Sequence, residues 1–212
     1  MNKIGWNEYF LKIAKTVAIK SKDPNTQVGA VIVKDNKIIS TGYNGMCTGV
    51  DETKIPWDRD KKDPKDNKYM YVVHAEANAI INCSDKKLLK NASIYVTDFP
   101  CNECAKLIIQ SGIEKVYYGQ NKYPNSDATI VAQKLFKLAD INVIQEYEKK
   151  EFQCSLQLYK LDTEEANDWN KVQISTMIIR AKDEKEAEEL YKKQLNREIS
   201  NDYIISIKEI NK

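Results

Sequence analysis

Residues 93–119, SIYVTDFPCNECAKLIIQSGIEKVYYG, contain the pattern that decides the fold. Residues 93–99 are rich in β-branched and aromatic side chains and predict a strand, whereas residues 101–111 follow a proline and predict a helix. Residues 115–119, KVYYG, then predict a second strand. Strand, helix and strand in this order are typical of two parallel strands joined by a crossover helix.

The segments on both sides continue this alternation. The further expected elements are a helix over 6–20, a hairpin over 27–45 that turns at Asp35-Asn36, helices over 74–83 and 126–139, and a strand over 141–147. Strands that alternate with helices predict an α/β fold, with a sheet covered on both faces and parallel pairing after the initial hairpin.

Two segments depart from the alternation. Residues 51–68, DETKIPWDRDKKDPKDNK, contain two prolines and dense charge of both signs, which predicts a long surface loop. The last block, residues 149–212, predicts a small α+β unit: strands over 151–161 and 171–181, a charged helix over 183–198 and a strand over 202–210. We expect this ββαβ extension, whose role is unknown, to be appended to a main domain of residues 1–148.

Composition narrows the class of protein. The 212 residues contain 33 Lys and Arg against 31 Asp and Glu, interspersed rather than collected in a basic tract, which argues against nucleic acid as a partner. No apolar run approaches the ~20 residues of a membrane helix, and residues 1–6 lack the apolar core of a secretory signal. We therefore expect no membrane partner and a cytoplasmic protein, whose five cysteines are thiols or metal ligands.

The single histidine of the chain indicates a metal site. His74 begins one expected helix, and Cys101 and Cys104 lie in the first turn of the next, where helix N-termini favour the thiolate form. One imidazole and two thiolates form a three-ligand zinc set that leaves a fourth tetrahedral position for water. Glu76 lies too close to His74 along the chain to be a comfortable fourth ligand, but it can reach that water and carry protons.

The alternative is a structural zinc site. Such sites usually have four protein ligands, and here Cys47, Cys83 or Cys154 would have to supply the fourth. That arrangement leaves Glu76 without a role. A C-x-x-C pair taken alone is equally compatible with redox chemistry.

Several separated motifs resemble one known family. The pattern H-x-E…P-C-x-x-C is typical of zinc-dependent nucleobase deaminases, and SKDPNTQVGAVIV, GYNGM, YVVHAEANAI and FPCNECAKLIIQSGIEKVYY together resemble deoxycytidylate deaminases of the cytidine deaminase superfamily. The resemblance covers about residues 4–147. It implies a three-layer α/β/α sandwich with a five-stranded mixed sheet, and zinc-dependent hydrolysis of dCMP to dUMP and ammonia, which supplies the precursor of dTMP.

The resemblance also implies roles for individual residues. His74, Cys101 and Cys104 fall where the family binds zinc, and Glu76 falls at its general acid/base. The positions that correspond to the substrate site are Lys22, Asn25, Thr26, Asn44, Ala75 and Tyr123. The residues alone also allow simpler interpretations: a turn residue for Asn44, a helix stop and turn for the SKDPNT segment, and a core tyrosine for Tyr123.

Regulation is the last property that the resemblance implies. It implies a homohexamer activated by dCTP and inhibited by dTTP, with Mg²⁺ possible beside the triphosphate. The expected effector residues are Tyr43, Gly45 and Arg59, although Cys47 stands where the family commonly has proline. A flexible, glycine-rich connector is the alternative for this turn.

Three other functions remain open from the sequence. A dCTP or dual dCMP/dCTP deaminase uses the same residues. A tRNA or single-stranded nucleic-acid deaminase uses the same zinc chemistry but needs a basic groove. A non-catalytic, zinc-stabilised nucleotide sensor needs no proton carrier, so Glu76 argues against it.

Overall fold

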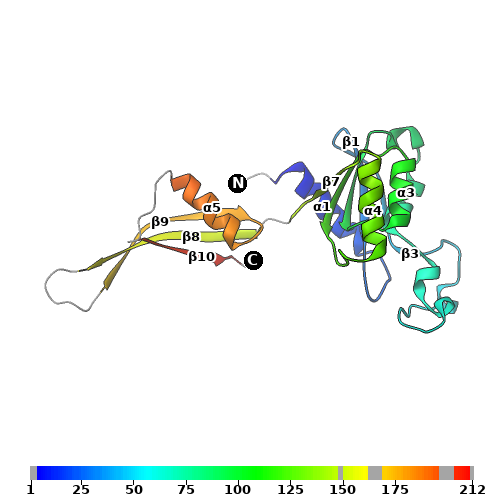
Figure 1. Ribbon diagram of the computed structural model, residues 1–212, viewed down its shortest axis with the longest axis horizontal. Helices are drawn as coiled ribbons and strands as arrows, with labels where there is room; N and C mark the ends of the chain where they lie inside the picture. Colours follow the sequence, from blue (N-terminus) through cyan, green and yellow to red (C-terminus); the bar gives the residue numbers. More distant parts are fainter. Residues whose placement is uncertain (1–3, 148–149, 162–168, 196–202, 211–212) are drawn as a thin grey trace. The chain divides into compact units, whose positions relative to one another are not determined.

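The structure is a computed structural model that describes residues 4–147, 150–161, 169–195 and 203–210. The chain divides into two compact units, Met1–Glu146 and Tyr147–Lys212 (Figure 1). Each unit contains a hydrophobic core built from its own side chains.

The first unit is built on a five-stranded mixed sheet with the order β2-β1-β5-β6-β7. Its strands are β1 (Gly29–Lys34), β2 (Lys37–Tyr43), β5 (Ser93–Asp98), β6 (Lys115–Gln120) and β7 (Asn142–Gln145). β1 pairs antiparallel with β2 and with β5, whereas β5, β6 and β7 are parallel to one another. The predicted hairpin followed by parallel strands is therefore confirmed.

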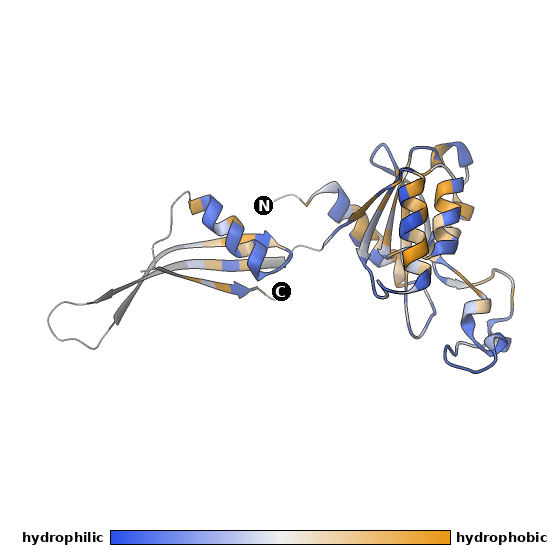
Figure 2. Cartoon of the chain, viewed as in Figure 1, coloured by the Kyte–Doolittle hydropathy of each residue, from blue (hydrophilic) through white to orange (hydrophobic). Residues whose placement is uncertain are grey.

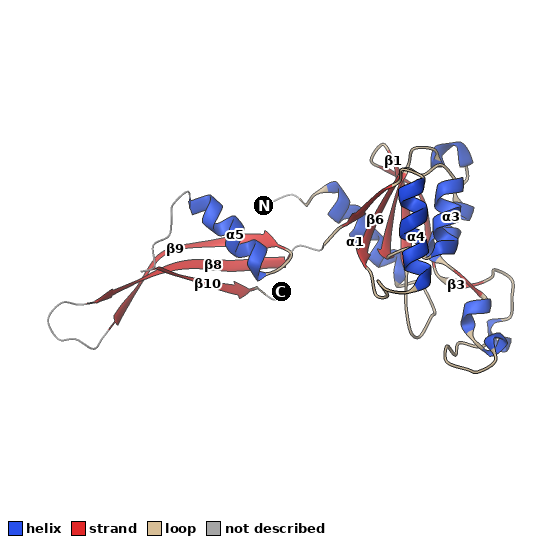
Figure 3. Cartoon of the chain, viewed as in Figure 1, coloured by secondary structure: helices blue, strands red, loops and turns tan. Residues whose placement is uncertain are grey.

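Helices cover both faces of this sheet (Figure 3). Alternation along β1 explains the layers: Val31 and Val33 pack with Phe10 of α1 (Trp6–Ala18), whereas Ala30 and Ile32 belong to the core on the opposite face. That opposite face is covered by α2 (Ala75–Asn82), α3 (Asn102–Gln110) and α4 (Asp127–Leu138). Apolar and polar stripes alternate around α3 and α4 in Figure 2, as expected for helices with one buried face. The predicted three-layer α/β/α sandwich is confirmed.

A glycine brings α2 unusually close to the sheet. A Cβ atom added at Gly42 of β2 would lie 2.2 Å from the backbone nitrogen of Ala79 and 2.4 Å from the carbonyl oxygen of Ala75, both on α2. Contacts this short force the backbone to move, so a side chain at this position would displace the helix. The close approach fixes the start of α2, where the candidate site begins.

The charged segment after β2 is a long loop, as predicted, but it contains short structure that sequence patterns do not reveal. Three 3₁₀ turns lie at Glu52–Lys54, Pro64–Asp66 and Lys68–Met70. A two-residue pairing of β3 (Gly45–Met46) with β4 (Val72–Val73) closes the base of the loop. Lys68 is buried, and its ammonium pairs with the carboxylate of Asp23.

The second unit has the predicted ββαβ order. Its strands β8 (Lys150–Leu161), β9 (Trp169–Ala181) and β10 (Tyr203–Glu209) form an antiparallel sheet in the order β10-β8-β9, and α5 (Glu184–Leu195) lies between β9 and β10 in sequence. Phe152, Cys154 and Ile179 of the sheet share a core with Ala187 and Tyr191 of α5.

Within the described ranges, no helix has both the length and the apolar character that crossing a membrane requires.

Candidate active site

Two helix N-termini place the candidate metal ligands. His74 is the N-cap of α2 and Cys101 is the N-cap of α3, and both have extended backbone angles. Cys104 lies one turn further, inside α3, where it is buried. Because both helices start at the same edge of the sheet, residues 27 and 30 positions apart meet there.

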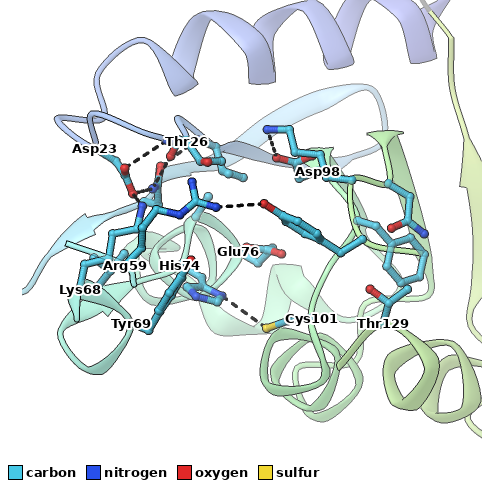
Figure 4. Close-up of a pocket in the computed structure, with 18 residues that line it drawn as sticks. Asp23, Thr26, Arg59, Lys68, Tyr69, His74, Glu76, Asp98, Cys101 and Thr129 are labelled. Carbon is cyan, nitrogen blue, oxygen red and sulfur yellow. Dashed lines mark hydrogen bonds and ion pairs between the residues drawn. The ribbon is translucent and has the colours of Figure 1, made fainter. Parts of the chain in front are cut away.

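The ligand atoms have the spacing of a metal site. Nδ1 of His74 lies 3.4 Å from Sγ of Cys101 and 3.4 Å from Sγ of Cys104 (Figure 4 shows the first contact). Zinc–nitrogen and zinc–sulfur bonds in a tetrahedron place such atoms about 3.6 Å apart. The donor set and its spacing therefore fit zinc.

Hydrogen bonds within the cluster shift the pKa values of its three members. A hydrogen bond with Cys101 raises the pKa of His74 to about 9, and hydrogen bonds with Cys104 and His74 lower the pKa of Cys101 to about 4. The hydrogen bond with Cys101, together with burial, raises the pKa of Cys104. Metal binding replaces such protons, because zinc ligands bind in their deprotonated forms.

In the described part of the chain, the cluster has three protein ligands and no fourth. His74, Cys101 and Cys104 are the one group of three or more potential ligands found there. The other cysteines have different contacts: Cys47 approaches the carbonyl oxygen of Tyr71, and Cys83 that of Asp85. Three ligands with an open fourth position are typical of catalytic rather than structural zinc.

Glu76 lies beside the cluster and is 4% exposed. Burial raises its pKa, because a carboxylate loses hydration there, and the nearby His74 opposes the shift. A buried carboxyl group with a raised pKa is suited to accept and return protons near neutral pH.

A cavity of about 190 Å³ opens beside these residues. Besides the metal ligands His74 and Cys101, six predicted residues line it: Thr26, Asn44, Arg59, Ala75, Glu76 and Tyr123. Tyr123 is 58% exposed, so the interpretation of a core tyrosine is wrong.

Asn44 has a different role from the one expected of a turn residue. Its Oδ1 accepts a hydrogen bond from the backbone of Val28 at 2.8 Å. Its Nδ2 donates to the carbonyl oxygen of Thr26 at 2.9 Å and to Oδ2 of Asp23 at 3.2 Å. Asn44 therefore holds residues 23–28 against the end of β2 while it lines the cavity.

Four predicted residues lie outside the cavity lining. Lys22 pairs with Glu52 at 3.0 Å, and Asn25 faces an adjoining hollow beside Trp57. Tyr43 and Gly45 flank the turn after β2. Arg59 was also expected at an effector site, but it lines the cavity itself, and its Nη2 lies 3.4 Å from the hydroxyl of Tyr123.

The sequence did not single out several residues that line the cavity. Two of them, Lys68 and Tyr69, lie in the long loop, and Asp98 is the last residue of β5. Two more, Lys122 and Thr129, lie in the chain that follows β6. The ends of parallel strands form the usual ligand crevice of α/β sheets, so the end of β5 was the available signal for Asp98. The lysines had no comparable signal.

Comparisons with known proteins agree with this geometry. The family model described as the cytidine and deoxycytidylate deaminase zinc-binding region matches residues 4–120. Deoxycytidylate deaminase of Homo sapiens is 50% identical over 137 residues, which are 64% of this chain and 76% of that protein. Deoxycytidylate deaminase of Mycobacterium phage D29 is 41% identical over 125 residues, which are 56% of this chain and 97% of that protein.

A solved structure shows the same fold. The dCMP deaminase of the cyanophage S-TIM5, in complex with dCMP and dUMP, superposes with a TM-score of 0.53 at 28% identity, over 69% of this chain and all of that one. With the fold, the histidine–cysteine cluster and the matching region, the chain belongs to the cytidine and deoxycytidylate deaminase family. It is a deaminase enzyme whose first unit contains the family's zinc-binding region.

Proposed function

We propose that this protein hydrolyses dCMP to dUMP and ammonia in the cavity beside His74, Cys101 and Cys104. The observation that carries the proposal is the arrangement of Glu76: a buried carboxyl group next to a three-ligand cluster, in a cavity open to a small molecule. The relatives named deoxycytidylate deaminase and the solved complex with dCMP and dUMP support this choice of substrate.

The ligand set would hold one zinc ion. When bound, zinc supplies a Lewis acid that lowers the pKa of water to about 7 and so provides a nucleophile at neutral pH. Glu76 takes a proton from the attacking water and delivers it to N3 of the cytosine. The hydroxide that remains adds to C4, and a second transfer by Glu76 moves the proton of the new C4 hydroxyl to the amino group. The bond between C4 and this nitrogen then breaks, so that ammonia leaves and the C4 carbonyl of dUMP forms.

The 5′-phosphate needs cations and donors at the other end of the nucleotide. We place it near Arg59, which lines the cavity and can form two parallel hydrogen bonds with phosphate oxygens. Thr26 and Tyr123 add hydroxyl donors from the same lining. Lys22 and Asn25 would reach the phosphate only after leaving the contacts described above.

One assay tests the proposal. The zinc-loaded full chain is incubated with dCMP, dCTP, deoxycytidine and CMP, and ammonia is measured together with the uracil product. We expect the highest kcat/KM with dCMP. Equal turnover of dCTP would establish the dual specificity instead, and binding of dCMP without ammonia release would establish a nucleotide sensor.

We also propose regulation by triphosphates at the turn after β2. The carbonyl oxygen of Tyr43 accepts a hydrogen bond from Nδ2 of Asn78 at 2.8 Å, and Asn78 lies on α2, the helix that carries Glu76. A ligand at Tyr43 and Gly45 would therefore act on the helix of the catalytic carboxylate. Mg²⁺ would arrive with the triphosphate, because the described residues there form no cluster of metal ligands.

The regulatory proposal has its own measurement. Saturation curves for dCMP are expected to be sigmoidal, to become hyperbolic with dCTP and to be suppressed by dTTP, in a protein that sediments as a hexamer. Hyperbolic kinetics indifferent to both triphosphates would remove the regulation and leave the deamination proposal intact.

A further inference from the structure

The carboxylate of Asp98 contains an unsatisfied oxygen. Of the residues that the structure describes, Oδ1 of Asp98 is the one buried side-chain oxygen or nitrogen without a hydrogen-bond partner. An unpaired buried acceptor lowers stability, so such an atom in a native protein calls for a physical reason. A ligand that donates a hydrogen bond to it is one such reason.

The other oxygen of the same carboxylate, Oδ2, forms an ion pair. Oδ2 of Asp98 lies 3.0 Å from Nζ of Lys122, and the Asp98 side chain is 17% exposed. Asp98 is also the last residue of β5, an interior strand of the sheet that pairs with β1 and β6. The position of Oδ1 is therefore fixed by the sheet and by Lys122 before any ligand binds.

Another aspartate of the same cavity shows the contrast. Oδ1 of Asp23 accepts from the backbone of Asn25 and Thr26, and its Oδ2 accepts from Asn44 and Lys68. The protein thus satisfies both oxygens of an aspartate that holds its own loops together. In Asp98, by contrast, one oxygen has no partner within the protein. Asp98 lines the same cavity as Glu76 and Cys101.

The orientation of the nucleotide in the cavity decides which of its groups would meet Oδ1 of Asp98. Figure 4 shows Asp98 on the opposite side of Glu76 from His74 and Cys101. In the proposed function, on which this inference rests, the amino group of dCMP lies at the cluster because it is the leaving group. The sugar then lies toward Asp98, and the one hydrogen-bond donor of a deoxyribose 5′-phosphate is its 3′-hydroxyl.

We propose that Oδ1 of Asp98 accepts a hydrogen bond from the 3′-hydroxyl of the bound deoxyribonucleotide. Asp98 is then a specificity-determining residue that selects nucleotides with a free 3′-hydroxyl, and Lys122 is a positioning residue that fixes the carboxylate. The hydroxyl completes the hydrogen bonding of a carboxylate whose Oδ1 is buried, and an analogue without it leaves that oxygen without a partner. Sites of this kind reject such analogues strongly.

The test compares dCMP with 2′,3′-dideoxycytidine 5′-monophosphate, which lacks only the 3′-hydroxyl. For the unaltered protein we expect kcat/KM to be about 10–100-fold higher with dCMP, as for a hydrogen bond to a charged group. Asp98→Ala should lower kcat/KM for dCMP by a similar factor and that for the dideoxy analogue by less than about 3-fold. Asp98→Asn keeps a neutral acceptor and should retain an intermediate preference.

Glu114→Ala is the matched control. Glu114 is exposed, pairs with Lys115 at 3.3 Å and lies outside the cavity lining, so its removal deletes a lysine-paired carboxylate without touching the nucleotide. We expect this variant to keep the full preference for dCMP. Thermal unfolding of each variant shows whether it is folded, and the asparagine variant serves if the alanine variant is not.

Two outcomes overturn the inference. One is an equal loss for both nucleotides in the Asp98 variants, which indicates a structural role alone. The other is an absence of discrimination in the unaltered protein. If the unaltered protein releases no ammonia, the proposed function fails. Calorimetric binding of dUMP and 2′,3′-dideoxyuridine 5′-monophosphate then still tests the hydrogen bond with Asp98. Equal affinity for the two nucleotides, or no binding of either, overturns the inference.

Discussion

His74, Glu76, Cys101 and Cys104 show how much chemistry short sequence spacings determine. Two separations, H-x-E and C-x-x-C, each bring their side chains close together because both pairs lie at the start of a helix. The meeting of the two pairs was expected because together they match one pattern, H-x-E…P-C-x-x-C, that is typical of zinc-dependent nucleobase deaminases. Strand positions did not reveal it: Cys101 follows β5 of the five-stranded sheet, whereas His74 follows β4, which pairs with β3. Lys68 was not predictable, since its importance arises from its pairing with Asp23, 45 residues away. For Asp98 only its place at the end of a strand was available as a signal, because its partner Lys122 lies 24 residues further along the chain.

Glu76→Gln tests the proton carrier. Glutamine keeps the size and hydrogen-bonding capacity of the side chain but cannot accept the proton, so we expect kcat for dCMP to fall by ~10²–10⁴-fold. Zinc content, measured by plasma mass spectrometry, should be unchanged. Loss of the metal in this variant would instead identify Glu76 as a ligand.

Cys101→Ser tests the ligand set. The purified chain should contain about one zinc per protomer, and the serine variant should bind it at least ~10-fold more weakly, because a neutral hydroxyl replaces a thiolate. Competition with a chromogenic chelator measures this affinity without any assay of activity. Cys47→Ser is the control, since Cys47 is exposed and outside the cluster; equal zinc affinity of both variants would contradict the assignment.

At the scale of elements, the helices and the five main strands followed from apolar periodicity, and the long loop followed from its prolines and charges, but the structure within the loop was not predictable. Its three 3₁₀ turns and the β3–β4 pairing depend on contacts that no local pattern contains. The loop nevertheless supplies Arg59, Lys68 and Tyr69 to the cavity. Its position is set by the buried pair of Lys68 with Asp23, whose side chains are 6% and 2% exposed.

Lys68→Met should destabilise the protein strongly. Removing one partner leaves the Asp23 carboxylate buried without its cation, which typically costs ~3–5 kcal/mol in the free energy of unfolding. Urea denaturation measures this change, with Lys65→Met as the control: Lys65 is an exposed lysine of the same loop, and its loss should change stability by less than ~0.5 kcal/mol. Equal effects of the two variants would show that the pair does not anchor the loop.

The same pair predicts a dependence of stability on pH. Burial alone would raise the pKa of Asp23, but hydrogen bonds from Lys68 and from the backbone of Asn25 and Thr26 lower it below 3.8, its ordinary value. A lowered carboxyl pKa contributes stability above the unfolded-chain value, and this contribution is lost as the pH falls through the folded-state value. Urea midpoints of the unaltered protein should therefore decline more steeply below pH 4 than those of Asp23→Asn.

At the scale of the whole molecule, the two units have separate cores. The clusters around Ile32 and Phe10 draw only on residues of Met1–Glu146, and the cluster around Tyr191 only on the second unit. We propose that the first unit is the catalytic domain. The ββαβ order of the second was predictable from alternating strands, and among the residues of that unit that the structure describes, no group of potential metal ligands lies together.

A chain that ends at Glu146 should therefore fold and bind zinc. We expect it to deaminate dCMP with a kcat within ~3-fold of the full chain, because the cavity lining lies entirely between Asp23 and Thr129. Circular dichroism, zinc content and ammonia release report on the three properties. An insoluble or inactive truncated chain would show that the second unit supports catalysis.

The long loop that lines the cavity also allows the binding of nucleotide to be followed by proteolysis. Lys61, Lys62 and Lys65 are exposed on it, so trypsin can cleave within the same segment that contributes Arg59 and Lys68 to the cavity. A nucleotide that contacts Arg59 ties this segment down and suppresses the local opening that proteolysis needs. The concentration of dCMP that halves the rate of cutting would then give its affinity even for a variant that cannot turn it over.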